Sequence, residues 1–201
     1  GQFTMKCLID EIVLTNKIEG VNSTRKEITE VLEKLSEKKS DRRFHGLVMK
    51  YSMLMDCASL KLDTCQDVRD IYNDLVLREV IEEDPHDAPD GVIFRKEAVS
   101  VTNAAQKEIH QGIVPESAIQ SAVQTVLDFI KDDSIDLLIR TGAAHYLFGY
   151  IHPFYNGNGR LSRFISSFLL TQELDPLIAY RLSYTVKENL TQYDDAFKLC
   201  N

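Results

Sequence analysis

The sequence has little of what marks several large classes of protein. Its 201 residues lack tryptophan and include only nine glycines and five prolines. Glycine and proline are too few for a collagen-like or low-complexity chain. No apolar stretch reaches the roughly 18 residues of a membrane span, and no signal-peptide pattern opens the chain. We therefore predict no membrane contact. Lysine and arginine number 23 against 31 acidic residues, and this excess of negative charge argues against a nucleic-acid-binding surface over the whole domain.

Cysteine is also scarce. The four cysteines lie far apart and form no C-x-x-C pair; they are Cys7, Cys57, Cys65 and Cys200. This spacing fits neither a zinc knuckle nor a disulfide framework. It predicts reduced, buried thiols and hence a cytoplasmic protein.

What the sequence does contain is helical periodicity over most of its length. Thr24 and Glu27 have the spacing of a capping box, Pro115 stands where the first residue of a helix is favoured, and Ser134 is a candidate cap. The ranges expected to be helical are residues 3–18, 25–35, 44–60, 68–80, 115–131, 135–150, 160–173 and 184–199. The last pattern continues to the final residues, so we expect the natural protein to extend further.

One segment favours a strand instead. Residues 82–91 are rich in proline and aspartate and predict a loop, and Val92 to Val101 are rich in β-branched residues. We expect this run to pair with a return strand near residues 109–114. The predicted fold is all-α, with about eight helices and one small β-hairpin.

The densest functional signal is the run His-Pro-Phe-Tyr-Asn-Gly-Asn-Gly-Arg-Leu-Ser-Arg at residues 152–163. Gly157 and Gly159 let the backbone approach a ligand closely, and they open a helix whose first N–H groups point outward. Arg160 and Arg163 share one face of that helix, and together with these N–H groups they suit a di- or triphosphate. His152 is a candidate general base near neutral pH.

This run resembles the signature of the Fic (filamentation-induced-by-cAMP) domain family, H-P-F-x-[D/E]-G-N-G-R-x-x-R, at eleven of its twelve positions. The resemblance implies a helical domain that transfers AMP from ATP to a protein hydroxyl with Mg²⁺. It assigns His152 as the base that takes the proton of a serine, threonine or tyrosine hydroxyl, and Phe154 as the anchor of the loop in the core.

The resemblance also assigns the phosphate contacts. Gly157, Asn158 and Gly159 would cradle the phosphates. Arg160 would bind the β- and γ-phosphates and stabilise the departing pyrophosphate, and Arg163 would pair with the γ-phosphate.

Position 156 departs from the pattern, because the family has an acidic Mg²⁺ ligand there and this chain has Asn156. An amide oxygen can ligate Mg²⁺, but it lacks the negative charge and should bind the ion more weakly. A catalytically weak nucleotide-binding module therefore remains an alternative to an active enzyme.

A second segment resembles the family's inhibitory motif, [S/T]-x-x-x-E-[G/N], at Thr15 to Gly20. Its place before the core helices is similar to the subclass with an N-terminal inhibitory helix. The resemblance implies an inhibitory segment at residues 1–22 and a catalytic core at residues 23–201. Glu19 would pair with Arg163 and compete with the γ-phosphate, while Thr15 supports the helix end. In some relatives such a glutamate also serves removal of AMP, so a bifunctional enzyme is a further alternative.

Three expectations concern partners. The hairpin around Val92 to Val101 resembles the flap with which the family holds its target protein by strand addition. Tyr193 and Asn201 resemble residues of the adenosine pocket in some relatives. A homo-oligomer and other transferred groups, such as UMP, phosphocholine or phosphate, are left open. The acidic charge disfavours DNA binding by this domain, while a further domain beyond Asn201 is left open.

Overall fold

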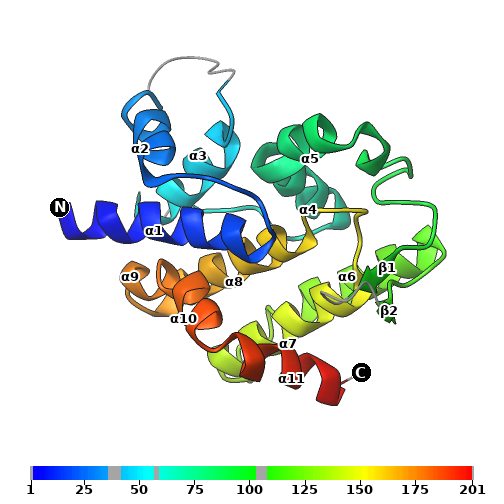
Figure 1. Ribbon diagram of the computed structural model, residues 1–201. Helices are drawn as coiled ribbons and strands as arrows, with labels where there is room; N and C mark the ends of the chain where they lie inside the picture. The colour runs from blue at the N-terminus through cyan, green and yellow to red at the C-terminus, as the bar shows by residue number, and fades with distance from the viewer. Residues whose placement is uncertain (1, 36–41, 57–58, 103–107, 201) are drawn as a thin grey trace.

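The computed structural model describes residues 2–35, 42–56, 59–102 and 108–200 (Figure 1). Helices account for most of these residues, and the strands found among them form one antiparallel hairpin, β1 (Ser100–Thr102) with β2 (Glu108–Gln111). The predicted all-α class with one small hairpin is confirmed. The helices are α1 (Gln2–Ile18), α2 (Arg25–Glu33), α3 (His45–Met53), α4 (Cys65–Tyr72), α5 (Arg78–Glu83), α6 (Glu116–Phe129), α7 (Leu137–Ile151), α8 (Asn158–Glu173), α9 (Pro176–Ala179), α10 (Leu182–Glu188) and α11 (Leu190–Cys200).

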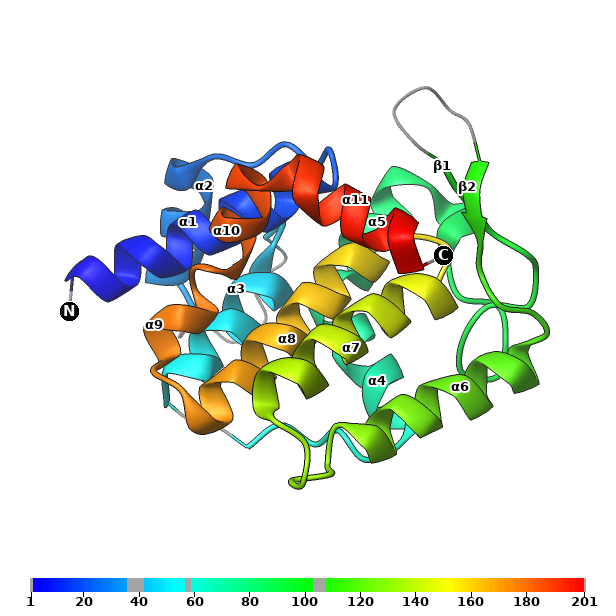
Figure 2. The same ribbon diagram turned by 90° about the horizontal axis from the view of Figure 1, so that it is seen from below.

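Helix α8 runs through the centre of the molecule. It packs along α7, and the other helices surround this pair (Figures 1 and 2). Every residue from Arg160 to Leu170 is buried. A helix that is buried on all sides must satisfy its polar side chains from neighbouring elements. The two arginines of the motif therefore depend on the helices around them.

Helix α1 crosses beside α10 and also contacts α2, α3 and α8. It ends at Ile18, and Gly20 then adopts the left-handed conformation with φ of 74°. The carbonyl of Asn16 accepts from both Glu19 N and Val21 N, at 3.0 and 2.9 Å. This turn fixes the direction in which Glu19 leaves the helix.

The predicted helix starts are partly right. Thr24 and Glu27 form the expected capping box, with bonds of 3.1 and 3.4 Å. Pro115 lies one position before the first helical residue, Glu116. The assignment of Ser134 is wrong, because Asp136 caps α7 by accepting from Leu138 N at 2.9 Å.

Three expected helices are interrupted. The stretch expected at residues 44–60 ends as α3 plus a short 3₁₀ turn at Leu54–Asp56, and the stretch at 68–80 contains a π-helical segment, Asn73–Leu77, between α4 and α5. The stretch at 184–199 divides into α10 and α11 at Asn189. A periodic sequence pattern does not register such changes in winding.

The expected strand at Val92 to Val101 is mostly wrong. Only its end, from Ser100, pairs with β2. The backbone N–H groups of residues 92–94 instead donate to the carboxylate of Glu116 at 2.9, 2.7 and 2.9 Å. These N–H groups are therefore unavailable for a strand ladder. The return strand is β2, at residues 108–111 rather than 109–114.

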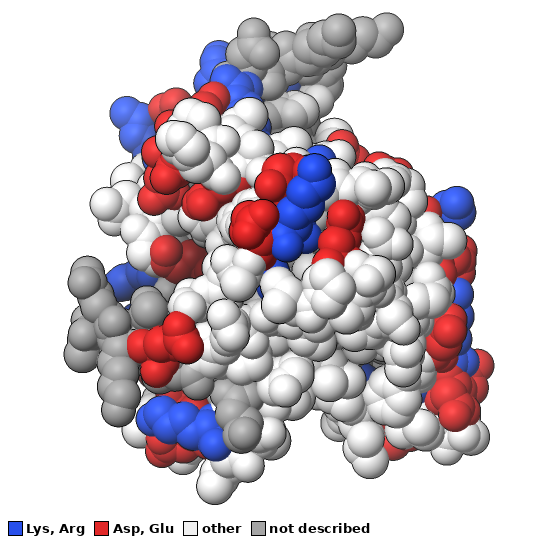
Figure 3. Space-filling model, turned by 90° about the vertical axis from the view of Figure 1, so that its right-hand side faces the viewer, with Lys and Arg blue, Asp and Glu red and all other residues white. Residues whose placement is uncertain are grey.

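Cys7 and Cys65 are buried as expected, whereas Cys200 is exposed and Cys57 lies outside the described residues. Within the described ranges, no helix is long and apolar enough to cross a membrane. On the face shown in Figure 3, lysines and arginines lie among acidic side chains and form no continuous basic area.

Candidate active site

The motif forms the loop between α7 and α8, and Phe154 anchors it as expected. The Phe154 ring is fully buried and stacks on Tyr72 of α4, with ring centroids 3.6 Å apart and planes 7° apart. The Asn158 side chain pins the loop further, accepting from Phe154 N at 3.0 Å and donating to Phe154 O at 2.8 Å. The side chain of Asn158 thus holds the loop, and its backbone N–H remains at the start of α8, where helices bind anions.

His152 ends α7 in the left-handed conformation, with φ of 52°. This conformation costs a non-glycine residue roughly 1–2 kcal/mol, so the surrounding contacts must hold it. Its Nδ1 lies 3.2 Å from the carbonyl oxygen of Gly149. A carbonyl only accepts, so Nδ1 carries the proton and Nε2 is left with a free lone pair. Burial lowers the pKa of His152 to about 4, which keeps the ring neutral at pH 7.

Arg95 is a residue of the site that the sequence analysis missed. Its side chain is fully buried, and Nε donates to the carbonyl of His152 at 2.9 Å. The other guanidinium nitrogens donate to the carbonyls of Glu97 and Ile113 at 2.6 and 3.0 Å. Arg95 thereby ties the segment before the hairpin to the strained end of α7. A lone arginine after a loop rich in proline and aspartate carries no sequence signal for this position.

The first turn of α8 lies against Glu19. Gly157, at the N-cap, is left-handed with φ of 79°. A Cβ atom built on Gly159 would lie 2.1 Å from Oε1 of Glu19, so any other residue at position 159 requires the Glu19 carboxylate to shift. The carboxylate therefore occupies the positive end of α8, where an anion is stabilised.

Glu19, Thr15 and Arg163 come together as predicted. Nη2 of Arg163 lies 2.7 Å from Oε1 of Glu19, and the Thr15 hydroxyl and carbonyl accept from the same guanidinium at 2.8 and 3.1 Å. Arg163 is 1% exposed and the Glu19 side chain 23%. Burial works against the charged form of Arg163, but the Glu19 carboxylate outweighs it and keeps the pKa of Arg163 above its ordinary value.

Arg160 lies beside this pair and faces a hollow of about 370 Å³. Its Nε is buried and has no hydrogen-bond partner in the structure. The hollow is also lined by three glutamates, Glu79, Glu82 and Glu83. Arg43 lines the hollow as well, so its wall carries charges of both signs. The unpartnered nitrogen marks Arg160 as the motif side chain with donor capacity to spare.

The Asn156 amide is hydrogen-bonded through both its oxygen and its nitrogen in this structure. Oδ1 accepts from Gly157 N at 2.7 Å, while Nδ2 donates to the carboxylate of Asp87 at 3.1 Å. Within the described ranges, no group of three or more His, Cys, Asp or Glu side chains could hold a metal. The donor set does fit Mg²⁺ that arrives with a nucleotide, because that ion needs only one or two carboxylates beside the phosphates.

Tyr193 reaches this region from α11. Its hydroxyl lies 2.8 Å from Nε2 of His145, whose Nδ1 lies 3.0 Å from the Ser166 hydroxyl. The Ser166 hydroxyl donates to a backbone carbonyl, so His145 donates through Nδ1 and Tyr193 donates to its Nε2. Burial raises the pKa of Tyr193 to about 12 and lowers that of His145 to about 4. Asn201, the other expected adenosine residue, lies outside the described residues.

Comparisons with known proteins concern the sequence family and the fold. The sequence model of the Fic/DOC family matches residues 63–170. A Fic family protein from Desulfovibrio desulfuricans G20 is similar with a TM-score of 0.73 and 18% identity, over 99% of this chain and 58% of that one. A Fic domain-containing signaling protein from Bacteroides thetaiotaomicron has a TM-score of 0.62 and 16% identity, over 92% and 71%. Fic-1 from C. elegans has a TM-score of 0.52 and 17% identity, over 96% and 64%. The chain thus spans a little over half of the Desulfovibrio protein, and at these identities the likeness concerns the fold.

Proposed function

Because this chain belongs to the Fic/DOC family, we propose that it is a protein adenylyltransferase that Glu19 holds inactive. It transfers AMP from ATP to a serine, threonine or tyrosine hydroxyl of a target protein. The observation that carries the proposal is the ion pair between Glu19 and Arg163, at 2.7 Å against the first turn of α8. A carboxylate held there occupies the contacts that a terminal phosphate needs.

The chemistry follows from the loop. The target hydroxyl attacks the α-phosphorus, the new O–P bond forms as the bond to pyrophosphate breaks, and Nε2 of His152 takes the hydroxyl proton. Its neutral ring and free Nε2 suit this role at pH 7. The N–H groups at the start of α8 and the guanidinium of Arg160 would stabilise the charge on the departing pyrophosphate.

Magnesium would arrive with ATP, and it would neutralise charge on the phosphates at the Asn156 side of the loop. The protein side chains then have to align hydroxyl and phosphorus, since positioning is most of phosphoryl-transfer catalysis. Glu19 would prevent this alignment by repelling the γ-phosphate and by keeping Arg163 from it.

The hairpin is the proposed docking site for the target. Ile113, just beyond β2, donates its N–H to the carbonyl of Ile151 at 3.1 Å, which sets the hairpin beside His152. His110 of β2 also packs on Tyr150 of α7, with ring centroids 4.5 Å apart. An extended target segment added to this hairpin would bring its hydroxyl toward Nε2 of His152.

The test uses ATP labelled at the α-phosphate, with Mg²⁺. Wild type, Glu19→Gly and Glu19→Gly/His152→Ala are incubated, and label on the protein itself is measured. We expect labelling in Glu19→Gly alone. Labelling of wild type at the same level would refute the inhibition, and no labelling of any variant with Mg²⁺ or Mn²⁺ would refute AMP transfer.

One observation favours a second candidate. Because the oxygen of Asn156 is bonded within the loop, the chain could act as a nucleotide-binding module with weak catalysis. ATP binding by Glu19→Gly without labelling would support that function. Release of AMP from a labelled target by wild type, but not by Glu19→Gly, would instead support the bifunctional enzyme.

A further inference from the structure

The side chain of Asn156 is fixed in one orientation by its neighbours. Its oxygen faces the N–H of Gly157, and its NH₂ group faces the carboxylate of Asp87. The reversed amide would set two donors against each other and an oxygen against a carboxylate. At the motif position that carries a carboxylate in the family signature, this chain presents an amide that holds a carboxylate from another segment.

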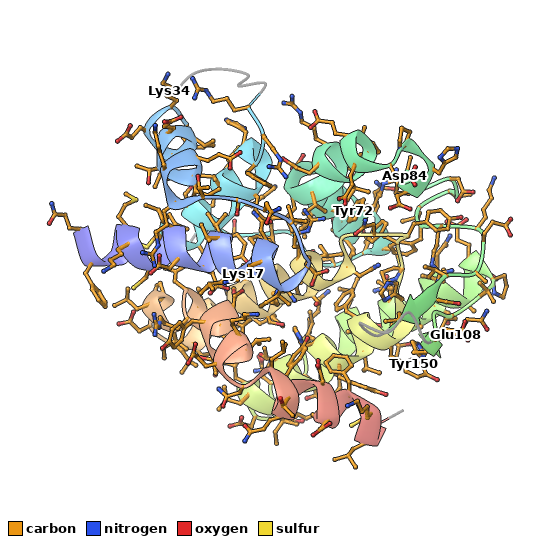
Figure 4. The ribbon with its side chains drawn as sticks, viewed as in Figure 1. Lys17, Lys34, Tyr72, Asp84, Glu108 and Tyr150 are labelled. Carbon is orange, nitrogen blue, oxygen red and sulfur yellow. The ribbon has the colours of Figure 1, made fainter. Side chains whose placement is uncertain are left out.

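That segment joins α5 to the hairpin and is attached to the motif at two consecutive residues. Asp87 accepts from Asn156, and Asp90 accepts from the hydroxyl of Tyr155 at 3.0 Å. The turn Pro85–Asp87 is closed by Asp84, whose Oδ1 accepts from His86 N at 2.9 Å. In Figure 4 the labelled Asp84 marks the beginning of this segment. The position of the Asp87 carboxylate is therefore set by the backbone of this anchored segment.

The pair keeps the charge that the substitution at position 156 removes. Asn156 and Asp87 together carry one negative charge, as a single acidic residue at 156 would. Among the described residues, no lysine or arginine forms an ion pair with Asp87, although the charges of Arg160 and Arg69 also act on the neighbouring Tyr72 hydroxyl and lower its pKa. The field of Asp87 also reaches the loop. After burial, which is the main cause, Asp87 contributes to raising the pKa of Tyr72, whose hydroxyl donates to the carbonyl of Asn156.

We propose that Asp87 supplies the carboxylate for the Mg²⁺ that accompanies the nucleoside triphosphate, and that Asn156 positions the Asp87 side chain. The proposal rests on the proposed function, because it concerns the ion brought by ATP. Mg²⁺ takes oxygen ligands and is held by one or two carboxylates plus phosphates. An acidic residue at position 156 would place its carboxylate directly against that of Asp87. The two negative charges would repel each other unless a cation lay between them.

The test measures ATP binding as a function of Mg²⁺ by calorimetry, in the Glu19→Gly background of the full chain. The variants are Asp87→Asn, Asn156→Asp and the exchange Asp87→Asn/Asn156→Asp, each also measured in EDTA. We expect Asp87→Asn to weaken the Mg²⁺-dependent binding about 10- to 100-fold. Binding of metal-free ATP should be unchanged or tighter, because one negative charge is removed. The exchange variant should recover the Mg²⁺ dependence.

Asp84→Asn is the matched control. It removes one charge from the same segment, and asparagine keeps the acceptor that closes the turn at His86. We expect its Mg²⁺ dependence to equal that of Glu19→Gly alone. If Asp84→Asn weakens binding as much as Asp87→Asn does, the effect comes from the total negative charge of this segment rather than from Asp87 itself, and the proposal is wrong.

The outcomes separate this proposal from the proposed function. Mg²⁺-dependent ATP binding that survives Asp87→Asn unchanged overturns the role of Asp87 and leaves the proposed function standing. Equal weakening with and without Mg²⁺, together with a lower unfolding temperature, assigns Asp87 a purely structural role and also overturns the proposal. Failure of Glu19→Gly to bind ATP under any condition overturns both.

Discussion

Removal of the Glu19 carboxylate should destabilise the protein and at the same time make ATP a stronger stabiliser. In Glu19→Gln the buried guanidinium of Arg163 keeps the two oxygens of Thr15 but loses its only charged partner in the described structure. Breaking a fully buried pair costs about 3–5 kcal/mol. The Glu19 side chain is 23% exposed, so water reaches the pair and we expect about 2–3 kcal/mol.

The assay is thermal unfolding with and without Mg-ATP. A chain of this size changes its unfolding temperature by about 2–4 °C per kcal/mol, so Glu19→Gln should unfold about 4–12 °C below wild type. ATP at 100 times its dissociation constant adds about 2.7 kcal/mol to the variant. Under the proposed inhibition the γ-phosphate must first displace Glu19 in wild type, so the same ATP concentration should raise the unfolding temperature less.

Glu33→Gln is the control, because this carboxylate is exposed near the end of α2 and its loss should change stability by less than about 0.5 kcal/mol. Equal ATP-induced shifts in wild type and Glu19→Gln would refute competition for Arg163. An unfolding temperature of Glu19→Gln equal to that of wild type would refute the estimate of the ion pair.

Three further predictions concern Gly159, His152 and Glu11. Gly159→Ala should destabilise wild type more than it destabilises Glu19→Gly in thermal unfolding, because the added Cβ meets the Glu19 carboxylate. The self-labelling rate of Glu19→Gly, measured against pH, should keep its plateau down to about pH 4, because burial holds the pKa of His152 near that value. Burial also raises the pKa of Glu11 to about 7, so its folded form retains a proton that the unfolded chain loses at about 4.5, and stability falls as pH rises through this window. Glu11→Gln should therefore gain about 3 kcal/mol relative to wild type between pH 4 and pH 8, measured by urea unfolding.

Each of these has an outcome that contradicts it. Equal costs of Gly159→Ala in both backgrounds would mean that Glu19 does not touch Gly159 in solution. An acid limb near the ordinary histidine pKa would show that the His152 ring is hydrated. A pH-independent difference between Glu11→Gln and wild type would show that Glu11 has the same pKa in the folded and unfolded chains.

The sequence predicts the helices and the motif loop because their determinants are local. The Thr24 capping box, the periodic apolar positions and the spacing from His152 to Arg163 lie within a few residues of one another. The pairing of Glu19 with Arg163 spans 144 residues, and only the resemblance to a family motif predicted it.

The sequence failed where a distant side chain redirects the backbone. Val92 to Phe94 have strand-like residues, but the carboxylate of Glu116 binds their N–H groups. The contact between Asn156 and Asp87 joins residues 69 apart, and Arg95 is recognisable only once α7 ends beside it. Buried polar contacts of this kind depend on the packing of the whole chain, which a periodic pattern does not encode.

Two buried contacts of α1, and a third, part-buried contact just beyond its end, limit how the proposed inhibition can be released. Glu11 is bonded to Ser183 of α10, and four residues further on Thr15 is bonded to Arg163; Glu19 follows after another four. If the whole of α1 moved away, Arg163 of α8 and the N–H of Ser183 on α10 would lose their buried hydrogen-bond acceptors. Rotation of the Glu19 side chain alone leaves these contacts intact. Under the proposed inhibition, release of Arg163 can therefore be as fast as a rotamer change of Glu19, and a substitution at residue 19 leaves the contacts of Glu11 and Thr15 in place.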